Sequence, residues 1–145
     1  GIGASAGGLD AISRLMTALP DKPGFALVFI QHLDPRQDSK LTGILGARAS
    51  IKVLEAEHGT RVVPDQAYVI KPNTDVALTD GHLSVTPRHD ERGPHYPIDH
   101  FLRSLAAVQG PRAIGVVLSG TGADGAYHAG AMRALQEASS CQSLD

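Results

Sequence analysis

Three apolar runs rich in β-branched residues punctuate the chain and predict strands. They are FALVFI (25–30), AYVIKP (67–72) and AIGVVLSG (113–120). The first and the last show no alternation of apolar and polar residues, which is typical of strands buried on both faces of a parallel sheet. We therefore expect a sheet that is covered on both sides.

Two segments between these runs have the spacing of amphipathic helices. In the first, apolar residues recur at i, i+3 and i+4 until Pro20 ends the pattern: Leu9, Ile12, Leu15, Met16 and Leu19. The second, PIDHFLRSLAAV (97–108), opens with a proline and Asp99, as helices often do. Because strands and helices alternate, the sequence predicts the α/β class.

The segment DVALTDGHLSVTP (75–87) differs, since two short alternating runs flank Asp80-Gly81. This dipeptide between alternating runs is the strongest short-range signal for a β-hairpin. We expect a small antiparallel hairpin added to the sheet. The next stretch, TPRHDERGPHYP (86–97), is polar and contains three prolines, which predicts a loop.

Length and composition fit one domain that needs no disulfide or metal ion for its stability. The chain has 145 residues, and 13 Lys+Arg against 15 Asp+Glu give a net charge of −2. No long run of one charge suggests a nucleic-acid groove or an anionic membrane surface. Cys141 is the single cysteine, and no stretch approaches the roughly 20 apolar residues of a membrane span. The simplest expectation is a cytoplasmic protein.

The chain opens on a glycine-rich stretch, GIGASAGGLD (1–10), which holds one hydroxyl group, that of Ser5. It has the character of a turn entering the first helix, so we expect a strand or a domain to precede it. Phosphate binding is disfavoured, because no Lys followed by Ser or Thr comes after Gly8 and the glycine positions do not fit G-x-G-x-x-G.

The same stretch fits G-x-S-x-G, with Ser5 between Gly3 and Gly7 and a helix directly after it. A serine on such a bend exposes its Oγ atom, and backbone N–H groups at the start of the helix can face a developing oxyanion. The pattern predicts a nucleophile. A structural alternative stays open at this point, in which Ser5 caps the helix of residues 9–19.

A serine nucleophile needs a base, and His32 is the best placed of the seven histidines. It follows the strand of residues 25–30, at the carboxyl edge where parallel sheets form ligand sites. The alternative for His32 is a strand-end histidine bonded only to backbone. The histidines of loops, hairpin and helix start are expected to be solvated or capping residues: His58, His82, His89, His95 and His100.

A third strand end delivers a carboxylate to the same edge. The stretch LSGTGADGA (118–126) follows the last apolar run, and its Asp124 would hold an imidazole in one tautomer and stabilise the charged form. Two other interpretations exist: Asp124 caps a helix beginning near Ala126, or it shares a metal ion with His128 four residues on. Two ligands without a third nearby disfavour the metal.

These motifs together resemble the catalytic domain of the chemotaxis protein-glutamate methylesterases. IGASAGGLDAI, IQHLDP, AYVIKPNTDVAL and the run from PIDHFLRSLA to LSGTGADGA occur in the same order and at similar spacing. The resemblance implies a doubly wound, mainly parallel sheet with an added antiparallel hairpin. It implies these roles: Ser5 as nucleophile, His32 as general base, Asp124 as orienting acid, and the backbone N–H groups of Ala6 and Thr121 as oxyanion donors.

The resemblance also implies a reaction, the hydrolysis of γ-glutamyl methyl esters on the cytoplasmic helices of chemoreceptors, with glutamine deamidation in some members. It implies no cofactor and no metal ion. The partners would be the methylated receptor helices and, outside this chain, a receiver or methyltransferase domain. The alternative is a catalytically silent module of the same fold that binds a receptor or a signalling domain. The intact serine, histidine and aspartate favour the enzyme.

Three departures limit what carries over from the family. Position 6 is Ala where many members have Thr, and position 121 is Thr where the best-known pattern has Met, so only backbone donors carry over there. The chain also ends in SSCQSLD, without the glycine-led strand and Gly-Met-Pro segment that usually follow, and it shows no receiver domain. We expect a single domain over residues 1–145 that is incomplete at both ends.

Overall fold

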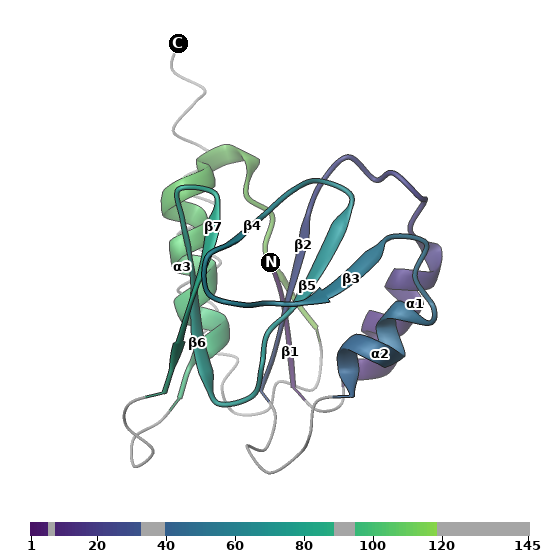
Figure 1. Cartoon of the computed structure of the whole chain (residues 1–145), viewed down its shortest axis with the longest axis horizontal. Coiled ribbons are helices and arrows are strands. Elements are labelled where there is room, and N and C mark those ends of the chain that lie inside the picture. The colour runs from purple at the N-terminus through teal and green to yellow at the C-terminus, as the bar shows by residue number, and fades with distance from the viewer. Residues whose placement is uncertain (6–7, 33–39, 89–94, 119–145) are drawn as a thin grey trace.

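The computed structural model describes residues 1–5, 8–32, 40–88 and 95–118. One set of strands is parallel: β1 (Ile2–Ser5), β2 (Leu27–His32), β3 (Lys52–Glu55), β5 (Gln66–Val69) and β8 (Val116–Val117). A second set is antiparallel: β4 (Thr60–Arg61), β6 (Thr74–Thr79) and β7 (His82–Pro87). The helices are α1 (Leu9–Ala18), α2 (Leu41–Gly46), α3 (Pro97–Gln109) and the short 3₁₀ helix η2 (Gly110–Arg112). Within the described residues the sheet orders are β3-β5-β2-β1-β8 and β4-β7-β6 (Figure 1).

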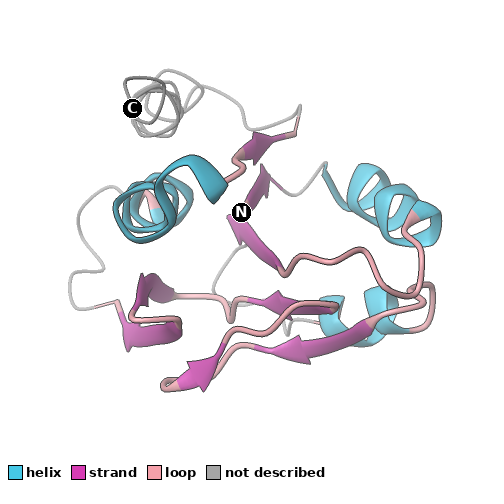
Figure 2. Ribbon diagram, turned by 90° about the horizontal axis from the view of Figure 1, so that it is seen from above, coloured by secondary structure: helices cyan, strands magenta, loops and turns pink. Residues whose placement is uncertain are grey.

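Helices cover both faces of the parallel sheet. Seen from above, α1 and α2 lie on one side and α3 lies on the other (Figure 2). The first four residues of β2 are all apolar because they pack on both faces of the sheet. Leu27 and Phe29 pack with α1 and α2. Val28 and Ile30 pack with α3 on the opposite face. The predicted α/β fold, with a doubly wound parallel sheet, is confirmed.

The hairpin of β6 and β7 turns at Asp80-Gly81, where the φ angles are +48° and +77°. Positive φ at both central residues is the mark of a type I′ turn, whose twist suits a two-residue hairpin. The predicted hairpin is confirmed, and β4 extends it to three strands through the pairing of Thr60 with Leu83. Helix α3 packs against β6 as well as β2 and β1, so it joins the two sheets.

Some elements have no counterpart among those predicted from the sequence. Strands β3 and β4 and helix α2 are each six residues or shorter, too short to show a clear period. The prediction of a turn at the start of the chain was only partly right, because residues 2–5 form strand β1, which lies between β2 and β8. Within the predicted strand 113–120, the structure has β8 at Val116–Val117. Residues 119–120 lie outside the described residues.

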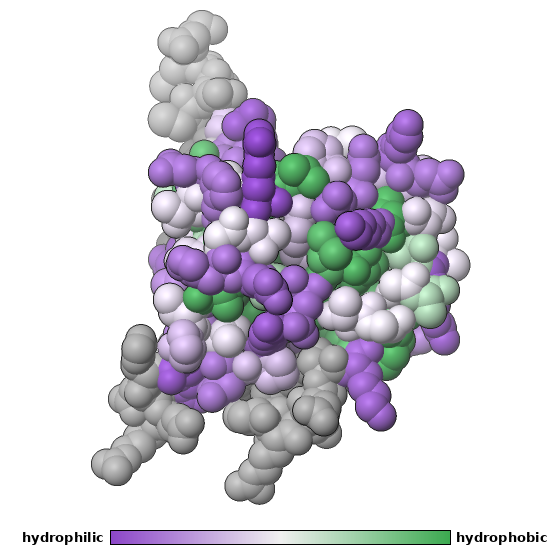
Figure 3. All heavy atoms as spheres, viewed as in Figure 1, coloured by the Kyte–Doolittle hydropathy of each residue, from purple (hydrophilic) through white to green (hydrophobic). Residues whose placement is uncertain are grey.

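The surface is mostly polar on the face shown in Figure 3, and apolar side chains gather on that face near β3 and α2. Among the described residues, the large apolar ones that are exposed are Phe25, Ile44, Val108, Ile114 and Val116. In the part of the chain that the structure describes, no helix is both long enough and apolar enough to cross a membrane.

Candidate active site

Ser5 and His32 are the last residues of two adjacent parallel strands. Ser5 ends β1, His32 ends β2, and the two residues are register partners in the ladder between these strands. Register partners on neighbouring strands lie about 4.8 Å apart in the direction of the hydrogen bonds. The fold therefore brings the backbones of the predicted nucleophile and base side by side, at the carboxyl edge of the sheet.

Close packing against β1 explains two of the opening glycines. A Cβ atom at Gly3 would lie 2.3 Å from Cγ2 of Ile98, so α3 rests directly on the backbone of β1. A Cβ atom at Gly8 would lie 2.4 Å from Cβ of Ala4, so the start of α1 lies equally close to the same strand. Only residues without a side chain allow both helices to approach the strand that ends in Ser5.

Ser5 does not occupy the N-cap position of α1 itself. The N-cap position of α1 is Gly8, a residue without a side chain. Ser5 lies three residues earlier, at the end of β1. Ligand sites of parallel sheets form outside the carboxyl ends of the strands, so the position of Ser5 favours a chemical role.

Strand β8 flanks β1 on the side opposite to β2. Val117 is in register with Gly3, and the N–H of Leu118 donates to the carbonyl oxygen of Gly3 at 2.9 Å. Because β8 is parallel to β1, the chain leaves β8 toward the edge that carries Ser5. The remaining predicted site residues lie outside the described residues, and their roles stay predictions: Ala6, Thr121, Asp124 and His128.

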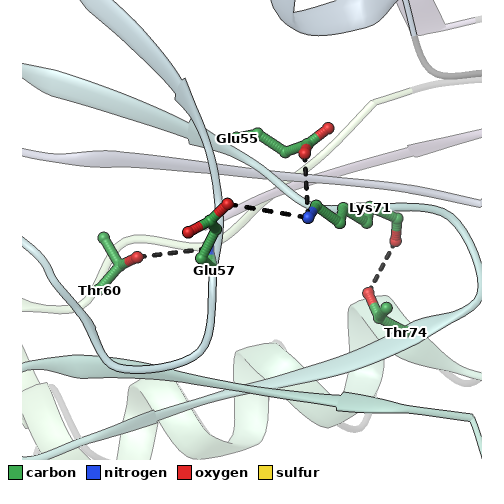
Figure 4. A network of polar contacts seen from close by, with 5 residues as sticks. All are labelled: Glu55, Glu57, Thr60, Lys71 and Thr74. Atoms are coloured by element: carbon green, nitrogen blue, oxygen red, sulfur yellow. Dashed lines mark hydrogen bonds and ion pairs between the residues drawn. The ribbon is translucent and has the colours of Figure 1, made fainter.

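A charged network lies where β3 and β5 end (Figure 4). Nζ of Lys71 is 3.1 Å from Oε1 of Glu55, the last residue of β3, and 4.0 Å from Oε1 of Glu57. The hydroxyl of Thr74 donates to the carbonyl oxygen of Lys71 at 2.7 Å. The Lys71 and Glu55 side chains are each 41% exposed, so solvent limits this ion pair to roughly 0–1 kcal/mol. The position of this network is of interest because β5 pairs with β2, the strand that ends in His32.

A histidine–carboxylate pair joins β6 to the segment before α3. Nε2 of His95 lies 2.8 Å from Oδ1 of Asp75, and the His95 side chain is only 12% exposed. The expectation that His95 is a solvated or capping residue is therefore wrong. No local sequence pattern predicts this pair, because His95 and Asp75 are 20 residues apart and belong to different parts of the fold. His89 lies outside the described residues, whereas three other histidines are exposed as expected: His58, His82 and His100.

Metal binding has no candidate in the described ranges. There, no three His, Cys, Asp or Glu side chains come together in a way that could hold a metal ion. The pair of the metal alternative, Asp124 and His128, lies outside these ranges.

The family model described as CheB methylesterase matches residues 1–144. The chain belongs to the CheB methylesterase family. The resemblance seen in the sequence motifs is thereby confirmed.

Curated relatives of this CheB-family chain carry two activities in their names. The protein-glutamate methylesterase/protein-glutamine glutaminase 3 of Burkholderia lata is 36% identical over 151 residues, which cover 97% of this chain and 41% of that protein. A protein-glutamate methylesterase/protein-glutamine glutaminase of Pectobacterium atrosepticum is 35% identical over 150 residues, covering 97% and 43%. The chain thus spans about two fifths of the length of these relatives.

A solved CheB structure has the same fold. The crystal structure of the Thermotoga maritima CheB methylesterase catalytic domain matches with a TM-score of 0.79 at 24% identity. The match covers 95% of this chain and 74% of that one. It confirms the architecture that places Ser5 and His32 at one sheet edge.

Proposed function

We propose that this chain is the hydrolytic part of a protein-glutamate methylesterase, which removes methyl esters from glutamate side chains of chemoreceptors and deamidates receptor glutamines at the same site. The observation that carries the proposal is the register pairing of Ser5 with His32 at the carboxyl edge. Family membership and the names of the relatives support the choice of substrate.

In the proposed first half-reaction, Oγ of Ser5 attacks the carbonyl carbon of the ester while His32 accepts the hydroxyl proton. Asp124 orients the imidazole and stabilises its charged form. The backbone N–H groups of Ala6 and Thr121 donate to the oxyanion. When the intermediate collapses, the bond to the methoxy oxygen breaks, His32 gives its proton to that oxygen, and methanol leaves an acyl group on Ser5.

The second half-reaction repeats these steps with water. His32 accepts a proton from a water molecule, whose oxygen attacks the acyl carbon, and the same N–H groups hold the second oxyanion. Collapse returns the proton to Oγ of Ser5 and releases a glutamate carboxylate. With glutamine as substrate, ammonia leaves in place of methanol. None of these steps requires a cofactor.

Packing supports the proposal, because the two strands that end in the reacting residues are held from both sides. Ala4, the residue before Ser5, is fully buried, and Ile30 is 1% exposed. Sites built on strands with packed neighbours hold their geometry better than sites on loops. Such positioning is a large part of what an enzyme contributes to a displacement at a carbonyl.

The test is methanol release from a methylated chemoreceptor fragment. We expect release by the wild-type chain, none from the unmethylated fragment, and a loss of at least about 10³-fold in the Ser5→Ala variant. Ser84→Ala, on β7 of the hairpin, is the matched control and should keep the wild-type rate. Undiminished release by a folded Ser5→Ala variant, with folding checked by circular dichroism, would show that another residue is the nucleophile.

A further inference from the structure

The start of α3 lies at the same sheet edge as the end of β1. Ile98, in the first turn of α3, lies against Gly3, whereas Leu102, one turn later, lies against Gly1. Helix α3 therefore runs opposite to β1, and its N-terminal end lies next to the end of β1 that carries the proposed nucleophile. His95 precedes this helix by two residues.

Strand β6 begins at this edge too, because a tight turn brings the chain into it from the end of β5. The turn contains Asn73, with a φ of +56°, and the hydroxyl of Thr74 donates to the carbonyl of Lys71 at 2.7 Å. Asp75 is the second residue of β6. Asp75 and His95 thus meet beside the carboxyl edge, and not at the far end of the hairpin.

The contact between His95 and Asp75 closes a ring of elements around the proposed site. Strand β1 pairs with β2, and β2 pairs with β5. The turn joins β5 to β6, the histidine–carboxylate contact joins β6 to the start of α3, and Ile98 on Gly3 joins α3 back to β1. Every contact in this ring except the turn connects residues that are far apart in the sequence.

The packing of α3 on β1 leaves the first turn of α3 little room to move. Because Ile98 occupies the space that a side chain at Gly3 would need, a displacement of the first turn of α3 either presses on β1 or opens a gap beside it. Misplacing reacting groups by about 1 Å can lower a rate on the order of 10²-fold. The position of the α3 start therefore bears on catalysis although α3 carries none of the proposed reacting groups.

We propose that His95 is a positioning residue: held by Asp75, it sets the first turn of α3 against β1 and so the position of Ser5 relative to His32. The inference rests on the proposed function. Its support is the 2.8 Å contact and the burial of the imidazole, since a side chain with 12% exposure gives water little access to this bond.

The experiment measures kcat and KM for methanol release from the methylated receptor fragment. His95→Ala and Asp75→Ala should each lower kcat about 10- to 100-fold, with KM changed less than about threefold. The double variant should be no slower than the slower single variant, because both changes remove the same contact. His95→Gln should recover most of kcat, since the glutamine amide can donate to Asp75 from near the position of Nε2.

Ser104→Ala is the matched control, because it removes a polar contact between α3 itself and β6. Oγ of Ser104 accepts from the N–H of Leu78 at 2.9 Å, farther along α3 and away from the carboxyl edge. This variant should lower the melting temperature as much as His95→Ala does, and leave kcat unchanged. A purely structural role for His95 would make the two variants behave alike.

The outcomes separate the two proposals. Wild-type kcat in folded His95→Ala or Asp75→Ala, or an equal loss of kcat in Ser104→Ala, overturns the positioning role while methanol release by the wild type upholds the function. Absence of release by the wild type overturns both. Asp75, at 33% exposure, is the less buried partner, so Asp75→Ala decides the question if His95→Ala does not fold.

Discussion

The parallel sheet and the antiparallel sheet are built from strands of similar length, but they are held in place differently. Strand β2 of the parallel sheet is buried on both faces, against α3 on one side and against α1 and α2 on the other. In β7 of the hairpin only Leu83 is fully buried, and the remaining residues are partly or largely exposed. A strand packed from both sides cannot slide without disturbing two cores, so its end is a stable place for reacting groups.

This difference predicts where substitutions act. The carboxyl edge of the parallel sheet carries Ser5 and His32, whereas the turn at Asp80-Gly81 lies at the opposite end of the hairpin from the edge where β6 begins. Substitutions at the parallel edge should change the rate, and substitutions in the hairpin turn should change only stability.

Asp124→Asn should lower kcat on the order of 10- to 1,000-fold with little change in KM, a smaller loss than that expected of Ser5→Ala. The amide keeps the shape of aspartate but loses the charge that stabilises imidazolium. A methoxide leaves more easily than an amine, so we expect less than the roughly 10⁴-fold loss of the serine-protease example. Steady-state kinetics of methanol release measure it.

Asp80→Asn, in the hairpin turn, is the control and should leave kcat unchanged, since asparagine also tolerates positive φ. Full activity of Asp124→Asn, combined with loss of activity in His128→Ala or on adding a chelator, would replace the triad by a metal-assisted mechanism.

The rate should rise with pH, about tenfold per unit below a midpoint of roughly 6 to 7.5, and then level off. In the proposed mechanism His32 accepts the proton of Ser5, and only a neutral imidazole can do so. A pH–kcat/KM profile from pH 5 to about 9 checks this. His82→Gln, in the hairpin, should leave the profile in place, and a flat wild-type profile with chemistry rate-limiting would remove His32 from the role of base.

Gly3→Ala should lower the free energy of unfolding by about 1–3 kcal/mol, because the added Cβ would lie 2.3 Å from Ile98 and force α3 away from β1. Urea unfolding measures the change. Gly43→Ala in α2, where a Cβ meets nothing within 4 Å, is the control and should be neutral or stabilising by up to about 1 kcal/mol. Equal effects at the two glycines would mean that α3 does not press on β1 as described.

Gly81→Ala should have the smallest effect, a loss of about 1 kcal/mol, because its φ of +77° is strained for a residue with a side chain although the space around it is open. Methanol release should be unchanged. A folded Gly81→Ala variant with reduced kcat would show that the hairpin turn acts on the site, which would break the contrast between the two sheets.

Local pattern was enough to predict the elements whose signal lies within a few residues. Helices α1 and α3 follow the predicted segments 9–19 and 97–108, because an amphipathic period repeats along each. The hairpin follows from Asp80-Gly81, since positive φ at two residues is a local demand on the backbone. Strand β2 begins two residues later than the apolar run and ends at His32.

The candidate site was predicted one residue at a time. A motif indicated Ser5, and the end of an apolar run indicated His32, but neither signal contains the order of the strands. That these residues are register partners depends on β1 lying next to β2, and on a pairing that matches Ile2 with Phe29. Strand order is set by packing across the whole sheet, which no window of the sequence displays.

The tertiary structure alone decided the character of β1 and the burial of His95. By local propensity a segment with glycines at positions 1, 3, 7 and 8 is a turn, but between β2 and β8 the backbone bonds of β1 are satisfied as a strand, and Gly3 makes room for Ile98. His95 likewise has the sequence surroundings of a solvated loop residue. It is buried because α3 packs on β6 and brings Asp75 within 2.8 Å, a contact between residues that only the folded chain places together.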